Sequence, residues 1–472
     1  MIAYGQGEKC RISNVVEGQS RRVTKSKRKE DTLSRHAKTL LGRRDFLRTS
    51  AAAGAMTLAS PGLLRAQAAD INLQTWSAAV DTVQSHVAAF SAKTGLGVAY
   101  GNSPYAQYRD AMVTKFVGGA PLDMMWVSDA WLPEWAEAGW IAPINDNEAL
   151  MAYNDEADDF CTNSMTYGGK QYGLTYYSDY MAFFYDAEKV AAAGFDGPPT
   201  TWAEVVEQSL AMKEQGVSEY PMMLAMAQES WLIEFISALV FSHGGKFTDE
   251  DGASVMQSSA GVQEALQWAM DAVNTHKIIS PACVETGELN GLKAFSSGNH
   301  AFAMVAKYRL RTLNDPEQSS IAGNVKQAMM PMGPNGSHST VGWMRFHGMS
   351  ASAAADPTRA ANTAKLMEWF GGKADGEYKF QKLLFLDIGA GFGVKPLFDD
   401  PDIRAAYDAY GDVDMVQAQQ SLALKKDVVT PWFGEWNETN GSAWQSAIIG
   451  NTDAASAIKA SSDLWTELKD SY

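Results

Sequence analysis

The stretch Leu122-Asp123-Met124-Met125-Trp126-Val127-Ser128-Asp129 decides the fold class of this chain. Its first six residues form a short, mainly apolar run, which is typical of a buried strand. A helical pattern through Trp131 and Trp135 follows directly and ends at Gly139, where a glycine commonly terminates a helix. A buried strand that leads into a helix is the repeating unit of α/β proteins, so this stretch predicts a sheet flanked by helices.

The same alternation continues through the rest of the chain. Further strand patterns cover residues 71–76, 96–100 and 301–305, and helical patterns cover 80–90, 202–215, 229–242, 357–370 and 444–468. Strands joined by crossover helices favour a largely parallel sheet, in which ligands gather beyond the carboxyl ends of the strands.

The charge of the chain is unevenly distributed. Its 472 residues include 39 Lys plus Arg and 55 Asp plus Glu, but the first 68 residues hold 14 basic and only 5 acidic side chains. The body from residue 69 onward therefore carries a net charge of about −25. A surface this acidic repels phosphate backbones and anionic lipid headgroups, so we expect a small-molecule partner and no nucleic acid.

The basic head of the chain has the features of an export signal. Arg43-Arg44 precedes Phe46-Leu47, a mildly apolar run covers 51–64, and Ala66-Gln67-Ala68 has the small-residue spacing of a cleavage site. Residues 1–68 therefore resemble a twin-arginine (Tat) signal peptide with a long basic n-region. The resemblance implies the Tat export machinery as a partner, cleavage near Ala68 and a periplasmic mature protein. The other interpretation is a basic arm before an amphipathic helix, which the small side chains of the apolar run disfavour.

The motifs of redox cofactors and metals are missing from the sequence. The mature part keeps only Cys161 and Cys283, and there is no C-x-x-C, C-x-x-C-H or H-E-x-x-H pattern. The glycine-rich run 389–393 lacks the G-x-G-x-x-G spacing and predicts a connecting loop. We therefore expect no metal and no cofactor, which argues against a periplasmic oxidoreductase.

Four stretches, taken together and in this order, resemble family 1 extracellular solute-binding proteins of ABC importers, the maltose- and oligosaccharide-binding group. They are DMMWVSD at 123–129, EAGWIAPI at 137–144, GKQYGL at 169–174 and AGFDGPPTTW at 193–202. The resemblance covers nearly all of residues 70–472. It implies an α/β two-lobe periplasmic-binding-protein fold of type II-like topology, each lobe a sheet flanked by helices, with multiple hinge crossings. By that pattern one lobe holds 70–182 plus 346–397, and the other holds 183–345 plus 398–472.

The resemblance also implies a function without catalysis. A monomeric protein of this kind captures a carbohydrate, which can be a sugar, an oligosaccharide or a sugar acid, and delivers it to the permease subunits in the inner membrane. A polyol or a polyamine is the alternative solute, the latter because of the acidic body. A secreted glycoside hydrolase or lyase is the alternative class, since paired carboxylates and Trp-lined clefts serve both binding and cleavage.

Two acids and a tyrosine stand where the family pattern places ligand contacts. Asp129 follows a strand, at a position where a buried carboxylate needs hydroxyls or a cation as partners. Its other interpretation is a cap for the helix that begins near Ala130. Asp179 and Tyr177 fall at the first crossing between lobes, although strand alternation leaves open whether Tyr176 is the inward residue.

Aromatic side chains at loop positions are candidates for stacking on a sugar ring. Gln228 and Trp231 match the family's "QE-x-aromatic" loop, and the alternative for Trp231 is a packing contact with Phe235 at the start of the helix. Trp343 matches the Gly-Trp turn that lines the cleft, and Trp76 follows the first strand.

The chain departs from the family pattern in its cations. Lys307, Tyr308 and Arg309 occupy a place where the family often carries a single aromatic residue, and Arg345 follows Trp343. Either the ligand carries a carboxylate or sulfate, or these cations pair with Asp129 and Asp179.

Overall fold

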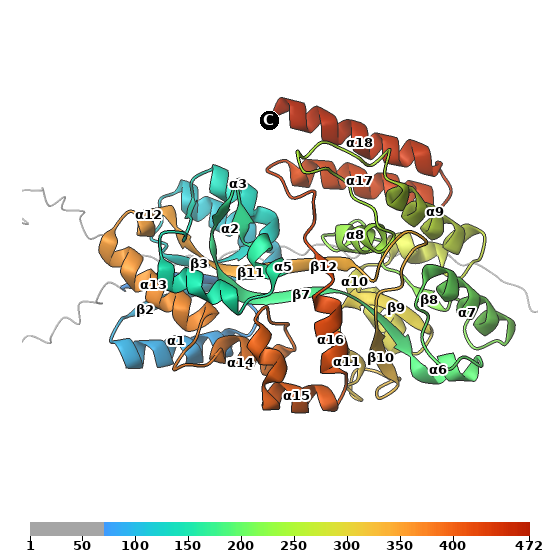
Figure 1. The fold of residues 1–472 in the computed structure, drawn as a ribbon, viewed down its shortest axis with the longest axis horizontal. Coiled ribbons are helices and arrows are strands. Elements are labelled where there is room, and N and C mark those ends of the chain that lie inside the picture. The colour runs from blue at the N-terminus through green and yellow to red at the C-terminus, as the bar shows by residue number, and fades with distance from the viewer. Residues whose placement is uncertain (1–69) are drawn as a thin grey trace, which may run out of the picture. The chain divides into compact units, whose positions relative to one another are not determined.

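Residues 70–472 are described by a computed structural model, in which they form one compact unit around a ten-stranded sheet (Figure 1). The expected signal peptide, residues 1–68, lies outside the described residues, and the Tat pathway stays a prediction. No helix in the described part is long and apolar enough to cross a membrane. Cys161 and Cys283 are buried and not bridged to each other.

The strands are short except for two. Their bounds are β1 Ile71–Trp76, β2 Val98–Ser103, β3 Met124–Ser128, β4 Ile141–Ala142, β5 Thr166–Tyr167, β6 Lys170–Gln171, β7 Gly173–Asp186, β8 Met222–Met223, β9 Phe302–Ala306, β10 Val325–Ala328, β11 Thr340–Ser350 and β12 Ala423–Leu424.

The main sheet runs in the order β2-β1-β3-β11-β7-β9-β8. Strand β1 is parallel to β2 and β3, and β8 is parallel to β9, but β11 and β7 are antiparallel to each other and to β3 and β9. The expectation of a largely parallel sheet is therefore wrong at the centre. Hydrophobic periodicity identifies a strand but not its partner, and antiparallel strands need no crossover helix between them.

The two long strands β7 and β11 connect the two ends of the sheet. The first part of β7 pairs with β11, from Gly173 to Tyr180, and its last part pairs with β9, from Met181 to Tyr185. The register of the β7–β11 pair shifts between Arg345 and Phe346, so that Tyr176 is an extra residue on β7. Such a bulge changes the face to which the following side chains point.

Helices cover both faces of the sheet. Their bounds are α1 Val80–Thr94, α2 Tyr105–Val117, α3 Leu132–Glu137, α4 Glu148–Met151, α5 Asp159–Ser164, α6 Ala187–Ala192, α7 Trp202–Glu214, α8 Leu232–Ser242, α9 Ala260–Asn274, α10 Glu288–Ser296, α11 Arg309–Leu313, α12 Ala351–Ala354, α13 Pro357–Gly371, α14 Lys379–Ile388, α15 Pro401–Asp408, α16 Val413–Gln420, α17 Phe433–Ile448 and α18 Ala454–Ser471. Four short 3-10 helices are η1 Asp129–Trp131, η2 Ala152–Asp155, η3 Pro281–Glu285 and η4 Lys395–Asp399.

The C-terminal helical region is two helices and not the single one expected over 444–468. Helices α17 and α18 pack side by side and are separated at Gly450, which has a φ of 79° (Figure 1). A left-handed glycine ends a helix, so the chain reverses there. The helix expected from residue 229 likewise begins later, at Leu232.

Candidate functional site

Four of the predicted site residues share one face of the β7–β11 pair. Trp343 is directly opposite Asp179, and Arg345 is directly opposite Tyr177. Because alternate residues of a strand point to the same face, this register places the four side chains next to one another. The bulge at Tyr176 decides that Tyr177, and not Tyr176, joins this group, since Tyr176 instead packs against His347 and Phe380.

The Asp129 carboxylate is fully partnered within the protein. Its Oδ1 accepts hydrogen bonds from Arg345 Nη1 at 2.7 Å and from the Ala130 amide at 2.9 Å, and its Oδ2 accepts from the Met344 amide at 3.0 Å. Burial by itself would raise the pKa of Asp129, but the charges of Lys426 and Arg345 hold it below its ordinary value. Asp129 is therefore an anion that fixes Arg345. It is not the cap of the helix that follows, because that position belongs to Ser128, whose Oγ accepts a hydrogen bond from the Ala130 amide.

A second buried ion pair lies beside the first. Lys426 Nζ donates to both carboxylate oxygens of Glu234, each at 2.9 Å. Burial raises the pKa of Glu234, and Lys426 opposes this rise. Glu234 comes from α8 and Lys426 from the segment after β12, so the pair ties these two elements together.

Asp179 is held in a similar way from three sides. The Tyr180 and Gly391 amides each donate to it at 3.1 Å, and Lys307 Nζ lies 3.7 Å from Oδ1. Burial raises the pKa of Asp179, while Lys307 and the two amides oppose that effect. Gly391 can approach because it has no side chain, since a Cβ there would lie 2.0 Å from the Ser178 carbonyl oxygen.

Arg309 also has a carboxylate partner inside the protein. Its Nε and Nη2 donate to the two oxygens of Glu288 at 2.8 and 3.0 Å. Its guanidinium lies over the Tyr308 ring, 4.7 Å from the centroid. The neighbouring Lys307 amide donates to the Tyr180 carbonyl oxygen of β7 at 3.0 Å, so Tyr308 follows directly after a contact with this strand. Burial raises the pKa of Tyr308 and the charge of Arg309 opposes the rise.

An aromatic group borders the Arg345 side chain. Trp76 stacks on Trp126 at 5.4 Å and on Tyr177 at 6.1 Å, and the edge of Tyr105 meets Trp76 at 5.8 Å. The guanidinium of Arg345 lies 5.8 Å from the Trp126 ring. These rings offer flat apolar faces beside charged groups, an arrangement suited to ligands that have both kinds of surface.

The remaining two candidates are placed differently. Trp231 is half-buried and meets Trp343 edge-to-face at 5.3 Å, which brings it into the β7–β11 group. Gln228 is exposed, and its amide donates to the Glu438 carbonyl oxygen of α17 at 3.1 Å. Among the described residues, no side-chain hydrogen bond joins Gln228 to the other candidates.

Three buried donors among the residues of this region have no hydrogen-bond partner in the described part of the chain. They are Arg345 Nε, Trp76 Nε1 and Trp126 Nε1. A buried N–H without an acceptor costs about 1–3 kcal/mol, so these donors favour an oxygen-bearing ligand at this place.

Sequence reasoning missed several residues of this site. Glu234 and Lys426 belong to it through their ion pair, Lys425 through its position beside Lys426, and Tyr105 and Trp126 through the rings. The doublet Lys425-Lys426 in an acidic body was a signal, but its distance in sequence from Glu234 and Asp129 gave no indication of contact. Trp126 was expected only as part of a buried strand, which it also is.

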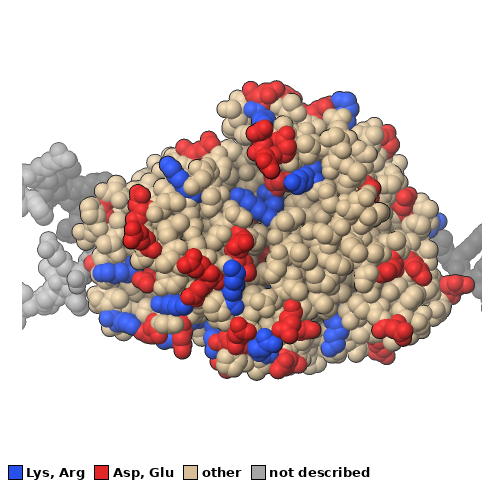
Figure 2. Space-filling view, in the orientation of Figure 1, with Lys and Arg blue, Asp and Glu red and all other residues tan. Residues whose placement is uncertain are grey.

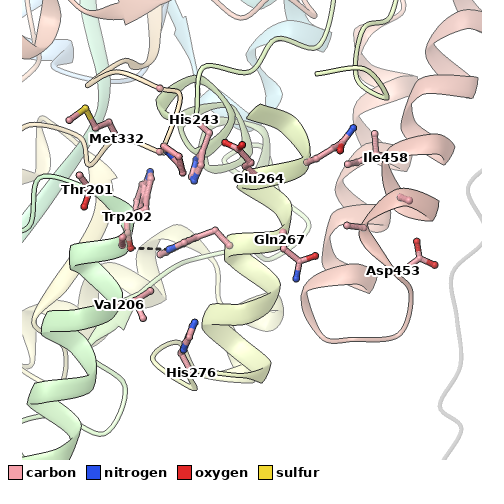
Figure 3. A pocket seen from close by; sticks show the side chains of 18 of the residues that line it. Thr201, Trp202, Val206, His243, Glu264, Gln267, His276, Met332, Asp453 and Ile458 are labelled. Carbon is pink, nitrogen blue, oxygen red and sulfur yellow. Dashed lines mark hydrogen bonds between the residues drawn. The ribbon is translucent and has the colours of Figure 1, made fainter. Parts of the chain in front are cut away.

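A separate pocket of about 1250 Å³ lies among α7, α9, α18 and the loop 332–336 (Figure 3). Trp202 and His243 stack in its wall, and Glu264 borders it from α9. None of the residues predicted from the sequence lines this pocket. In the part of the chain that the structure describes, no group of three or more His, Cys, Asp or Glu side chains is arranged to hold a metal ion.

Comparisons with known proteins agree with this architecture. The profile of the family described as bacterial extracellular solute-binding protein matches residues 76–377. A probable ABC transporter-binding protein of Deinococcus radiodurans is 24% identical over 306 residues, which are 62% of this chain and 68% of the relative.

Solved structures with similar folds are two-lobe periplasmic binding proteins, and this chain shares that fold. Maltose-bound MalE3 of T. maritima has a TM-score of 0.70 and 20% identity, covering 84% of this chain and 99% of the other. The sugar-binding protein MalE of Xanthomonas citri has a TM-score of 0.72 and 18% identity, covering 84% and 96%.

Proposed function

This chain belongs to the bacterial extracellular solute-binding protein family, and we propose that it captures a carbohydrate or polyol between its two lobes for the membrane permease of an ABC importer. Proteins of this family bind small solutes and work with such permeases. We further propose that the protein acts in the periplasm as a monomer after export through the Tat pathway.

The observation that carries the proposal is the group formed by Trp76, Tyr177, Trp231, Trp343 and Arg345. A sugar or polyol presents apolar C–H faces and many hydroxyls, so it needs flat rings and fixed hydrogen-bonding groups in the same place. Proteins of similar fold were solved with maltose, ribitol, tagatose and mannitol, which belong to this chemical class.

The pairing of charges argues against a polyamine as the solute. Asp129, Asp179, Glu234 and Glu288 each have a Lys or Arg partner inside the protein. A polycation needs carboxylates whose charge is not already compensated, and these four do not offer it. A glycoside hydrolase needs two carboxyl groups that act as acid, base or nucleophile. Carboxylates that are paired with Arg or Lys inside the protein are not available for these roles, so the four acids do not favour a hydrolase.

We place the lobes at 70–182 plus 346–397 and 183–345 plus 398–472, with β7 and β11 as two of the crossings. Support comes from the change of partner along β7, which pairs with β11 up to Tyr180 and with β9 from Met181. In this scheme the candidate residues lie at the junction, where closure of the lobes would enclose a solute.

A ligand screen of the full chain tests this function. In a thermal-shift screen against monosaccharides, oligosaccharides, polyols and polyamines, we expect a rise of several degrees with a sugar or polyol. Ligand at about 100 times its dissociation constant adds about 2.7 kcal/mol to native stability. A shift with polyamines alone, or with no sugar or polyol, contradicts the proposal.

A pair of tryptophan variants then locates the site. Trp231→Ala should weaken binding of the identified solute by about 1–3 kcal/mol through loss of stacking area. Trp268→Ala, in the separate pocket, should leave the affinity unchanged. Equal losses in both variants, measured by titration calorimetry, would remove Trp231 from the site.

A further inference from the structure

Five charged side chains gather where η1, α8, β11 and the segment after β12 meet. They are the carboxylates Asp129 and Glu234 and the cations Arg345, Lys425 and Lys426. Arg345 lies on β11, and β12, which leads directly into Lys425 and Lys426, pairs with the first two residues of the same strand. The charge of Lys425 also helps to lower the pKa of Asp129. Three positive charges against two negative ones leave one positive charge uncompensated.

The uncompensated charge is on Lys425. Arg345 pairs with Asp129 at 2.7 Å, and Lys426 pairs with Glu234 at 2.9 Å. Among the described residues Lys425 forms no ion pair, and its Nζ donates only to the Asn163 and Thr166 carbonyl oxygens, both at 3.3 Å. An ammonium group has three donors, so one donor of Lys425 is free.

Burial makes this surplus charge unfavourable. Lys426 is 2% exposed, Arg345 is 8% exposed and Lys425 is half-buried. Burial lowers the pKa of Lys425, and the adjacent Lys426 adds to the effect while Asp129 opposes it. Charges withdrawn from water are stable only when an opposite charge compensates them.

Arg345 supplies a second, independent indication of the missing partner. Its Nε is buried and has no acceptor, although Nη1 is engaged by Asp129 and by the Met344 carbonyl oxygen. The guanidinium is held over Trp126, so the free N–H has a fixed direction. A fixed guanidinium N–H on β11 and an ammonium group that directly follows the paired strand β12 are together a suitable receptor for a carboxylate.

We propose that the solute carries one carboxylate, bound by Lys425 and by the free Nε of Arg345, and is therefore a sugar acid or an acidic polyol. This inference rests on the proposed function. Lys307 and Arg309, which the sequence also offers as partners for a ligand carboxylate, are not part of this anion site, because Asp179 and Glu288 compensate their charges. Figure 2 shows Lys and Arg side chains at the surface near the middle of this face, where in Figure 1 the segment after β12 runs toward α17.

The experiment compares acids with their neutral parents. Titration calorimetry on the full chain measures the affinity for D-glucuronate, D-galacturonate and D-gluconate beside D-glucose, D-galactose and D-sorbitol. We expect at least one acid to bind at least about tenfold more tightly than its neutral parent. Added salt should weaken the acid more than the neutral parent.

Two variants test whether Lys425 causes the preference for the acid over its neutral parent. Lys425→Met should weaken the acid at least about tenfold and the neutral parent less than about threefold. Lys459→Met is the control, because Lys459 is an exposed cation paired with Asp463 on α18 and should leave both affinities unchanged. Unchanged thermal unfolding of both variants would show that they fold.

The outcomes separate this inference from the proposed function. A neutral parent that binds as tightly as its acid overturns the carboxylate site and leaves the sugar-binding function in place. Equal losses in Lys425→Met and Lys459→Met also overturn it, because they would show only a long-range effect of charge. Absence of binding by every sugar, polyol and acid would reject both.

Discussion

At the scale of single residues, the site is built from buried ion pairs whose members hold each other in position. Asp129 is 1% exposed and Asp179 is fully buried, and each accepts hydrogen bonds from backbone amides as well as lying beside a cation. Such pairs contribute little net stability compared with apolar packing, but removing one member leaves an uncompensated buried charge. We therefore regard Asp129 as a residue that positions Arg345.

This view predicts the effect of a nearly isosteric change. Asp129→Asn should lower the free energy of unfolding by about 3 kcal/mol or more, because Arg345 would remain buried with no opposite charge beside it. Urea unfolding followed by tryptophan fluorescence measures the loss. The control is Asp463→Asn, which breaks the exposed pair with Lys459 and should cost less than about 1 kcal/mol. Similar small effects of both changes would contradict the role given to Asp129.

At the scale of elements, the site depends on how closely the loop 389–393 approaches strand β7. The amide of Gly391 donates to Asp179, and a Cβ on Gly391 would collide with the Ser178 carbonyl oxygen. The sequence predicts this glycine-rich run as a connecting loop but offers no reason for its glycines. The structure supplies a reason at Gly391, since any side chain there would push the loop away from Asp179.

A single methyl group tests this close approach. Gly391→Ala places a Cβ at 2.0 Å from the Ser178 carbonyl oxygen, which forces the loop or the strand to move. We expect a loss of unfolding free energy of about 2 kcal/mol or more and weaker solute binding. Gly197→Ala is the control, because a Cβ on Gly197 would meet no atom within 4 Å and the φ of Gly197 is not positive. It should change stability by less than about 1 kcal/mol. Equal stability of the two variants would rule out a tight contact at Gly391.

At the scale of the whole molecule, buried histidines tie stability to pH. Burial lowers the pKa of His86, His243, His300 and His347. His86 is the best defined of these, because burial lowers its pKa to about 4 and its Nε2 lies 2.9 Å from the Trp369 carbonyl oxygen. These side chains are neutral in the folded protein and become protonated when the chain unfolds in mild acid.

The sign of the pH dependence follows from these directions. Between pH 6.5 and about 4 the unfolded chain binds a proton at His86 that the folded chain does not, so stability falls as the pH decreases through this window. The neutral His86 causes no loss above the window, and its protonation lowers the free energy of unfolding by about 3 kcal/mol once the pH is below the window. His86→Gln keeps an amide donor for Trp369 but cannot titrate. Its unfolding free energy, measured in urea at several pH values, should fall less steeply between pH 6.5 and 4.5. Parallel curves for variant and parent would contradict the assignment.

The amino-acid sequence determined the class of the fold and the place of most candidate residues along it. Strand and helix patterns are local, and the stretch 122–139 already contains a strand, a turn and a helix, so periodicity alone identifies the α/β class. The order of short motifs points to the family, and Tyr177, Asp179 and Trp343 follow from their positions in that order, whereas Arg345 stands out as a cation that departs from the family pattern. The register of β7 and β11 then places these four on one face.

The tertiary structure decided which residues are partners. The antiparallel centre of the sheet, the bulge at Tyr176 and the break at Gly450 do not follow from local patterns. Arg345 and Asp129 are 216 residues apart, and Lys426 and Glu234 are 192 apart. Because an ion pair depends on distance in space and leaves no periodic trace along the chain, only the folded chain shows that Lys425 is the one cation of its group of five charges without a carboxylate partner among the described residues.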